Sequence, residues 1–364
     1  MSNENVNITQ GARLLMIITA IIIVLLGMRA AADIINTIAL AFIMSVSMTP
    51  ILNWLIRKGL PRGVALLTVT ILVVLVVVLL IVIVIVSLQN VISTLPTYQN
   101  ELQGLQNDLV STLSSHGVDI TELKDSQTFS SENIINAGVS AASAIIGVFS
   151  SWFFMLLLVT YMLIEAIDFP AKIQKTLKAG SAMPARILKA NKSLRSYIFM
   201  TVWLGALNAV IMTIIMLVLG VDFALLWGIL TFIMSFIPYV GFIIAMMPPT
   251  AMALLEGGWV MALIIIASFL IINTLTDNVL KPRIMGAGLN LSPVVIMLSL
   301  FIWAWILGPM GALLAVPMTI IVKELFLESG EDTQWIANIM MPLDSIPDTN
   351  DSVPVRQETS DDTA

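Results

Sequence analysis

The chain has 364 residues, of which 58% are hydrophobic and only 11% charged, and its formal net charge is −6. Soluble domains have about 25% charged residues, so this composition, with a mean hydropathy of +0.99, excludes a soluble globular protein and a disordered one. The absence of cysteine excludes disulfides and thiol chemistry, and the single histidine, His116, excludes a two-histidine zinc motif. The acidic balance gives no indication of a nucleic-acid partner.

Long uncharged runs separate the charged residues, which is typical of a polytopic membrane protein. Backbone polar groups find no partner in lipid, so spanning segments of this length must be helices. We expect an all-α integral membrane protein with about six full transmembrane helices and two broken or re-entrant helical hairpins. The expected spans are 14–32, 34–56, 64–88, 139–164, 197–220 and 259–280, and the hairpins are 223–255 and 291–322.

Basic residues indicate the sidedness of these helices, because cytoplasmic loops are enriched in Lys and Arg. The loops 57–62 and 165–196 are rich in cations and are expected inside, whereas 89–138 has Lys124 as its only basic residue and is expected outside. Both termini are then cytoplasmic. Residues 172–195 are expected to form basic surface helices against anionic lipid, although an ordinary positive-inside loop explains the same charges.

The stretches 223–255 and 291–322 are too long for simple crossings. As continuous helices they would measure roughly 48–50 Å, whereas the hydrocarbon layer is about 30 Å thick. Each contains residues that interrupt helices. These are Pro238, Gly241, Pro248 and Pro249 in the first stretch, and Gly308, Pro309, Gly311 and Pro317 in the second. We predict hairpins that enter and leave on one side, and a single tilted, kinked helix is the alternative.

A weak internal repeat relates the two hairpins. Residues 220–223 (GVDF) resemble residues 288–291 (GLNL), Gly241 matches Gly311, and Pro248 matches Pro317, at offsets of 68, 70 and 69 residues. Paired segments interrupted by Gly and Pro are typical of inverted repeats around the substrate site of secondary transporters. Chance similarity between apolar segments explains the match equally well.

Polar side chains within the apolar half are candidate functional residues. Asn273, Asp277 and Lys281 are four residues apart and therefore share one helix face, with Asn278 beside them. A carboxylate at membrane depth is costly unless it is paired, so Asp277 is a candidate coupling site with Lys281 as its partner. Alternatively, both lie at the cytoplasmic interface. Glu165 is either a second coupling site or a charge at a helix end.

For other polar and aromatic side chains the sequence gives weaker evidence of a role in transport. Trp227, Phe236 and Tyr239 can stack on a solute, although aromatic residues in membranes more often pack or anchor helices. Asn208 is expected to form a hydrogen bond with a neighbouring helix. The sequence has no GxSxG or P-loop motif, so we expect neither an enzyme nor an ATP-driven pump, and no catalytic residue, cofactor or metal.

Four motifs together resemble the autoinducer-2 exporter family of bacterial membrane proteins. They are FALLWG at 223–228, IPYVG at 237–241, KPRIMG at 281–286, and LGPMG at 307–311 followed by AVP at 315–317. The resemblance covers essentially residues 10–330. The matching residues are Trp227, Gly228, Pro238, Gly241, Pro282, Arg283, Gly286, Gly308, Gly311 and Pro317. Asp277 and Lys281 do not belong to a fixed family pattern.

The resemblance implies a secondary transporter of the bacterial inner membrane that forms a homo-oligomer, with a pentamer as the expected state. It implies export of autoinducer-2, a small polar signal of quorum sensing, and the alternative is sodium–proton antiport. We expect an elevator-like movement of the hairpin core, with the tips at 238–241 and 308–311 near the midplane. The expected partners are a small polar solute and membrane lipids.

These expectations divide the chain into parts and select a transport path. The parts are N-terminal transmembrane helices (1–88), an extracytoplasmic helical segment (89–138), a transmembrane helix with basic surface helices (139–196), a transport core (197–323) and an acidic cytoplasmic tail (324–364) with a disordered end. The predicted path comprises Trp227, Gly228, Pro238, Tyr239, Gly241, Asn273, Asp277, Asn278, Gly308, Gly311 and Pro317. The candidate coupling residues are Asp277, Glu165 and Lys281.

Overall fold

The computed structural model describes residues 10–94, 152–176, 183–281, 283, 291–329 and 333–342. These residues are helical and include no strand, which confirms the all-α class. Among them, five helices are long and apolar enough to cross a membrane. The outer segment beyond residue 94, His116, the motif residues Pro282 and Gly286, and the end of the acidic tail lie outside the described residues.

Of the first four described helices, the second, third and fourth share one apolar cluster. The helices are α1 (Gln10–Ala30), α2 (Ala32–Arg57), α3 (Arg62–Thr94) and α7 (Trp152–Thr176). Leu52 of α2, Val69 of α3 and Leu163 of α7 are fully buried against one another. Close packing of this kind holds helices together where lipid removes the hydrophobic driving force. α7 extends beyond the predicted end of its span at residue 164.

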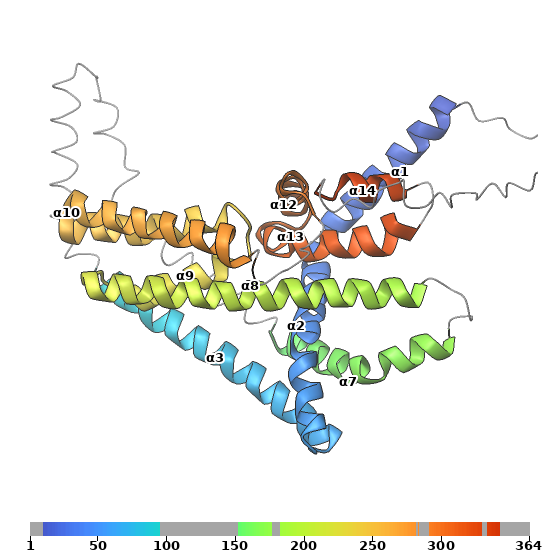
Figure 1. The fold of residues 1–364 in the computed structure, drawn as a ribbon, viewed down its shortest axis with the longest axis horizontal. Coiled ribbons are helices and arrows are strands. Elements are labelled where there is room, and N and C mark those ends of the chain that lie inside the picture. The colour runs from blue at the N-terminus through green and yellow to red at the C-terminus, as the bar shows by residue number, and fades with distance from the viewer. Residues whose placement is uncertain are drawn as a thin grey trace, which may run out of the picture.

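Helix α8 (Met183–Leu219) runs along the whole molecule and contacts both hairpins (Figure 1). Its 37 residues correspond to roughly 55 Å, so it begins well before the predicted start at residue 197. The cations of 183–195 form the first turns of α8, so this part of the predicted basic surface helices is the start of the long helix. Pro184 is tolerated in the first turn, and the residues after it favour helix.

The first predicted hairpin is present, with helical legs either side of a break at 235–240. Its legs are α9 (Ala224–Met234) and the first part of α10 (Gly241–Leu275). The two ends of this hairpin meet, because the backbone N–H of Asp222 donates to both carboxylate oxygens of Glu256 at 3.1 Å. Gly258, at φ +68°, then turns the chain. The stretch Gly241–Leu280 therefore consists of two helical segments, which pack on each other through Met252 and Ile265.

The second predicted hairpin consists of α12 (Pro293–Leu307) and α13 (Pro309–Ile321), joined at Gly308. Gly308 has φ +70°, a conformation that favours glycine because it has no Cβ. The legs are antiparallel: Leu291 packs with Ile320 at the open end, and the Trp303 indole N–H donates to the Thr319 hydroxyl at 3.0 Å. Both stretches are therefore hairpins and not single kinked helices.

Glycine at two matching places lets the hairpin legs approach closely. A Cβ at Gly241 would lie 1.8 Å from the Met234 carbonyl oxygen, and one at Gly311 would lie 1.9 Å from the Trp303 carbonyl oxygen. This equivalence supports the Gly241–Gly311 pair of the repeat. Pro248 and Pro317, however, lie inside helices and break neither, because neighbouring groups can satisfy the freed carbonyls of a membrane helix.

Both hairpin regions continue into short π-helical turns. η3 (Thr276–Leu280) follows α10, and η4 (Val322–Phe326) follows α13, with η5 (Leu327–Ser329) and α14 (Gln334–Ile339) after it. Such turns are rare and are often found at functional sites. Glu324, predicted as the start of an acidic tail, is buried in η4.

Replacing Gly311 by alanine should open the second hairpin. The added Cβ meets a backbone carbonyl that cannot rotate away, so we expect a loss of about 1–3 kcal/mol in the free energy of unfolding. Thermal unfolding of the detergent-purified chain measures this loss. Gly27→Ala is the matched control, because nothing lies within 4 Å of its Cβ. An equal effect of both substitutions would contradict the close-approach explanation.

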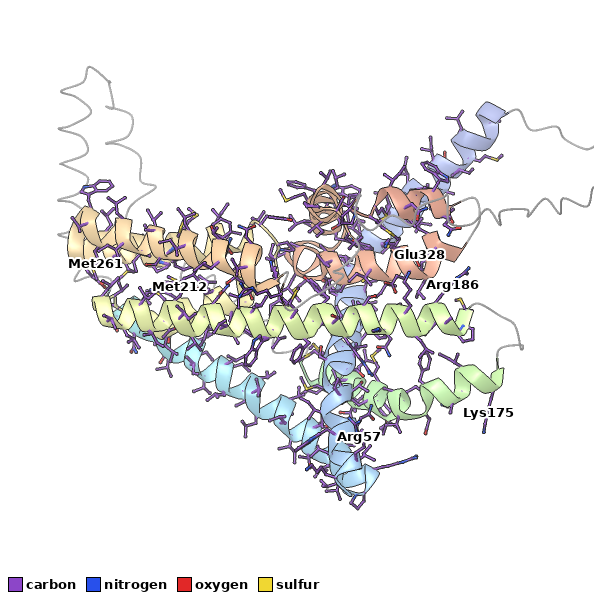
Figure 2. The ribbon with its side chains drawn as sticks, viewed as in Figure 1. Arg57, Lys175, Arg186, Met212, Met261 and Glu328 are labelled. Atoms are coloured by element: carbon purple, nitrogen blue, oxygen red, sulfur yellow. The ribbon has the colours of Figure 1, made fainter. Side chains whose placement is uncertain are left out.

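The hairpin geometry also predicts the sidedness of residue 259. Figure 2 places Met261, next to the Gly258 turn, at the opposite end of the molecule from Lys175. A cysteine at the exposed Trp259 should therefore react with an impermeant thiol reagent in intact cells, whereas Lys175→Cys should react only after permeabilisation. The chain has no native cysteine to interfere. Labelling of both positions from one side would overturn the predicted orientation.

Candidate functional site

A cavity of about 870 Å³, within the size range of small-molecule sites, lies where α8 meets both hairpin regions. Its wall comes from the middle of α8, the break at 235–240, the end of α10 with η3, and the open end of the second hairpin. Five predicted path or coupling residues line it together: Pro238, Tyr239, Asn273, Asp277 and Lys281. In the sequence Asn273 lies 34 positions after Tyr239, and the turn at Gly258 brings the two groups to one place.

Asp277 is the centre of the polar side of this cavity. Its Oδ2 accepts from the Asn273 side-chain amide at 3.2 Å, and its Oδ1 pairs with the Lys281 ammonium. The predicted polar stripe is therefore confirmed. Both members of the ion pair are partly exposed to the cavity, so they keep hydrogen-bonding capacity for a solute. Asp277 lies in the π-helical turn η3, which widens the helix at this point.

A second polar contact joins two helices across the cavity. The Thr276 hydroxyl donates to the Asn208 side-chain oxygen at 2.7 Å, linking η3 to α8. Asn208 thus forms the predicted hydrogen bond between helices. Its side-chain N–H groups are the remaining donors of this amide, and Asn208 lines the cavity.

Hydroxyl groups supply acceptors from the opposite wall. Thr231 donates to the Trp227 carbonyl at 2.8 Å, and Ser235 donates to the Phe232 carbonyl at 2.6 Å. Since these donations use the hydroxyl protons, the lone pairs of both oxygens are available to a solute that donates. Neither residue was predicted to line the site, because a hydroxyl group in an apolar helix more often only forms a hydrogen bond with its own helix backbone.

The break at 235–240 brings irregular backbone to the cavity. Tyr239 has φ +61°, which is uncommon for a non-glycine residue and typical of functional sites. The turn is held by hydrogen bonds from the Val240 N–H to the Pro238 carbonyl at 2.7 Å and from the Gly241 N–H to the Ile237 carbonyl at 3.1 Å. The Tyr239 side chain is partly exposed and lines the cavity.

The other predicted path residues do not line the cavity. Gly228 allows α9 to approach Thr213 of α8, and the Trp227 indole N–H donates to the Asp222 carbonyl at 3.0 Å. Gly241, Gly308 and Gly311 shape the hairpins, Pro317 is buried in α13, and Asn278 is exposed elsewhere. These positions hold the frame of the site.

The hairpin tips meet through apolar contacts. Ile237 and Val240 of the first tip belong to the same cluster as Leu307 and Ala312 of the second. The cavity therefore lies beside the first tip, and the second hairpin contributes its open end through Leu291 and Pro293 and the middle of α13 through Val316.

Glu165 lies outside the cavity, on α7. Its carboxylate pairs with Lys172 at 2.6 Å, and both side chains are more than half exposed, at 53% and 58%. An exposed pair of this kind contributes little to stability. The structure therefore does not place Glu165 with Asp277.

Comparison with known proteins decides the family. A model of the AI-2E family transporters matches residues 15–329. The chain belongs to this family. It is 32% identical to the AI-2 transport protein TqsA of Escherichia coli over 92% of this chain and 96% of that protein. It is 29% identical to YhhT of Escherichia coli, a presumed transport protein, over 91% of this chain and 95% of that protein. With its apolar helices, this AI-2E protein is a multi-pass membrane transporter.

The contact between Asn208 and Thr276 should be measurable as a coupling energy. We expect Asn208→Ala and Thr276→Val to destabilise non-additively, with a coupling of about 1 kcal/mol, because the bond is partly buried. A double-mutant cycle on thermal unfolding of the purified protein gives this value. Strictly additive effects would show that the two helices do not depend on this bond.

Proposed function

We propose that this AI-2E transporter exports a small, polar, hydroxylated solute, autoinducer-2, across the bacterial inner membrane. The observation that carries this proposal is the gathering of amide, hydroxyl and paired charged groups in one cavity among apolar helices. Such groups bind hydroxyls by donating and accepting at once. The name of TqsA as an AI-2 transport protein supports the choice of solute.

The balanced charge of the cavity favours a neutral solute. Asp277 and Lys281 are the charged side chains among the described residues that line the cavity, and they pair with each other, so neither an anion nor a cation finds an unpaired counter-charge there. A hydroxylated solute can donate to the Asp277 carboxylate and accept from the Lys281 ammonium without separating them. Hydrogen bonds to charged groups are stronger than neutral ones, at about 1.5–3 kcal/mol each.

Transport then requires the two faces of the cavity to open in turn. In our proposal the two hairpins move as a core against the N-terminal helices, in an elevator-like movement. The apolar contact between the tips supports their movement as a unit. The proposal also places both termini in the cytoplasm. A homo-oligomer, with a pentamer as the expected state, forms the stationary frame.

Efflux of autoinducer-2 from proteoliposomes tests this function. Asp277→Asn and Asn208→Ala should each reduce efflux about tenfold, the effect of one lost hydrogen bond of roughly 1.4 kcal/mol. Glu165→Gln is the matched control and should transport normally, because Glu165 is exposed on α7. Absence of efflux by intact, folded wild-type protein would reject autoinducer-2 as the solute.

Sodium–proton antiport is the second candidate, and the carboxylate of Asp277 in the cavity favours it. In that case sodium should drive pH changes in everted vesicles, and Asp277→Asn should abolish them because the amide cannot bind and release a proton. The same Glu165→Gln control applies. Sodium-driven pH changes that persist in Asp277→Asn would exclude this site as the antiport centre.

A further inference from the structure

A second group of charged residues lies at the base of the second hairpin and does not line the cavity. We name it the base cluster: Lys189 and Ser193 of α8, Lys323 and Glu324 of η4, and Glu328 of η5. Lys323 is 3% exposed and Glu324 is 6% exposed, which is unusual for charged side chains. Figure 2 shows Glu328 at the same end of the molecule as Arg186, in the first turns of α8.

The cations of the base cluster are directed to Glu328. Its Oε2 pairs with the Lys189 ammonium at 2.5 Å, and its Oε1, which is buried without a hydrogen-bond partner among the described residues, lies 3.4 Å from the Lys323 ammonium. Of the described elements beside η4 and η5, α13 and α14 contain no titratable side chain. Glu328 therefore faces two ammonium groups, whereas Glu324 forms no ion pair within 4 Å among the described residues.

Glu324 has a different environment. Its Oε1 lies 2.6 Å from the Ser193 hydroxyl, and its Oε2 is buried with no hydrogen-bond partner among the described residues. A buried anion with an unsatisfied oxygen is strongly disfavoured, and such a carboxyl group takes up a proton instead. The short distance to Ser193 fits a neutral acid equally well, since Glu324 can then donate to the serine oxygen.

We propose that Glu324 is a proton-binding site whose occupancy sets how the base of the second hairpin is held to α8. The proton comes from bulk water on the side of the partly exposed Lys189 and returns there. Uptake converts the carboxylate into a carboxylic acid, and release restores the anion beside Lys189 and Lys323. No other ligand is needed.

Helix α8 connects this site to the cavity. Ser193, Tyr197, Thr201 and Gly205 follow at intervals of four residues, so they share one face. Ser193 contacts Glu324, whereas the other three line the cavity. Val316 of α13, two turns before Glu324, lines it from the hairpin side. Protonation of Glu324 therefore acts on the two elements that form this wall, and its effect on transport rests on the proposed function.

Difference infrared spectroscopy of the purified full chain tests proton binding without any transport substrate. The carbonyl stretching band of a buried carboxylic acid should appear as pH falls, and Glu324→Gln should remove it completely. Glu328→Gln is the matched control and should keep the band but move its appearance to lower pH, because Lys189 and Lys323 lose their partner and then favour the Glu324 anion. Ser193→Ala retains the acid but removes its partner, so the band should shift in frequency.

The outcomes separate the parts of the proposal. A wild-type chain without the band, or a band retained in folded Glu324→Gln, overturns the proton site whether or not autoinducer-2 is the solute. If the band is confirmed, the rate of autoinducer-2 efflux should depend on pH in the wild-type and Glu165→Gln proteins and lose that dependence in Glu324→Gln. A pH dependence that persists in Glu324→Gln overturns the link to transport and leaves the proton site intact.

Discussion

The structure depends on one constraint: a backbone group that leaves a helix inside an apolar environment must find another partner. The second hairpin shows how this is met. Gly308 ends α12 and leaves the Leu307 carbonyl without its helical donor, and the Asn36 side chain of α2 donates to that carbonyl at 3.1 Å. A residue 271 positions away thus makes the turn possible. In the conformation of this structure, α2 therefore holds the turn of the second hairpin.

The same constraint explains why the cavity lies beside the first hairpin's break. At 235–240 the chain satisfies its own backbone with short turns and places Tyr239 in a left-handed conformation. Irregular backbone at membrane depth is tolerated where it lines a cavity or is buried in protein. The apolar second tip covers one side of this break, and the polar residues of η3 and α8 face the other. The break is consequently both an architectural element and a wall of the site.

The sequence was sufficient for features whose cause is local. Segment length with Gly and Pro predicted both hairpins, and four-residue spacing predicted the contact of Asp277 with Lys281. Features that depend on distant partners were missed. Thr276 meets Asn208 across 68 residues, and Glu324 is buried by Ser193, 131 residues away. An acidic run after an apolar helix has the same local pattern whether it is a free tail or a buried turn.

The family motifs and the cavity residues have different physical roles. Gly228 and Gly241 occupy places where a Cβ would collide with a facing helix or backbone, so they determine how the helices pack. Asn208, Asp277 and Lys281 instead present hydrogen-bonding groups to the cavity. A resemblance based on the glycines consequently identifies the frame of the site more than the polar residues of the cavity. The motifs also reach the cavity at Tyr239 and Lys281, whereas Asn208 and Asp277 line it from outside the motifs.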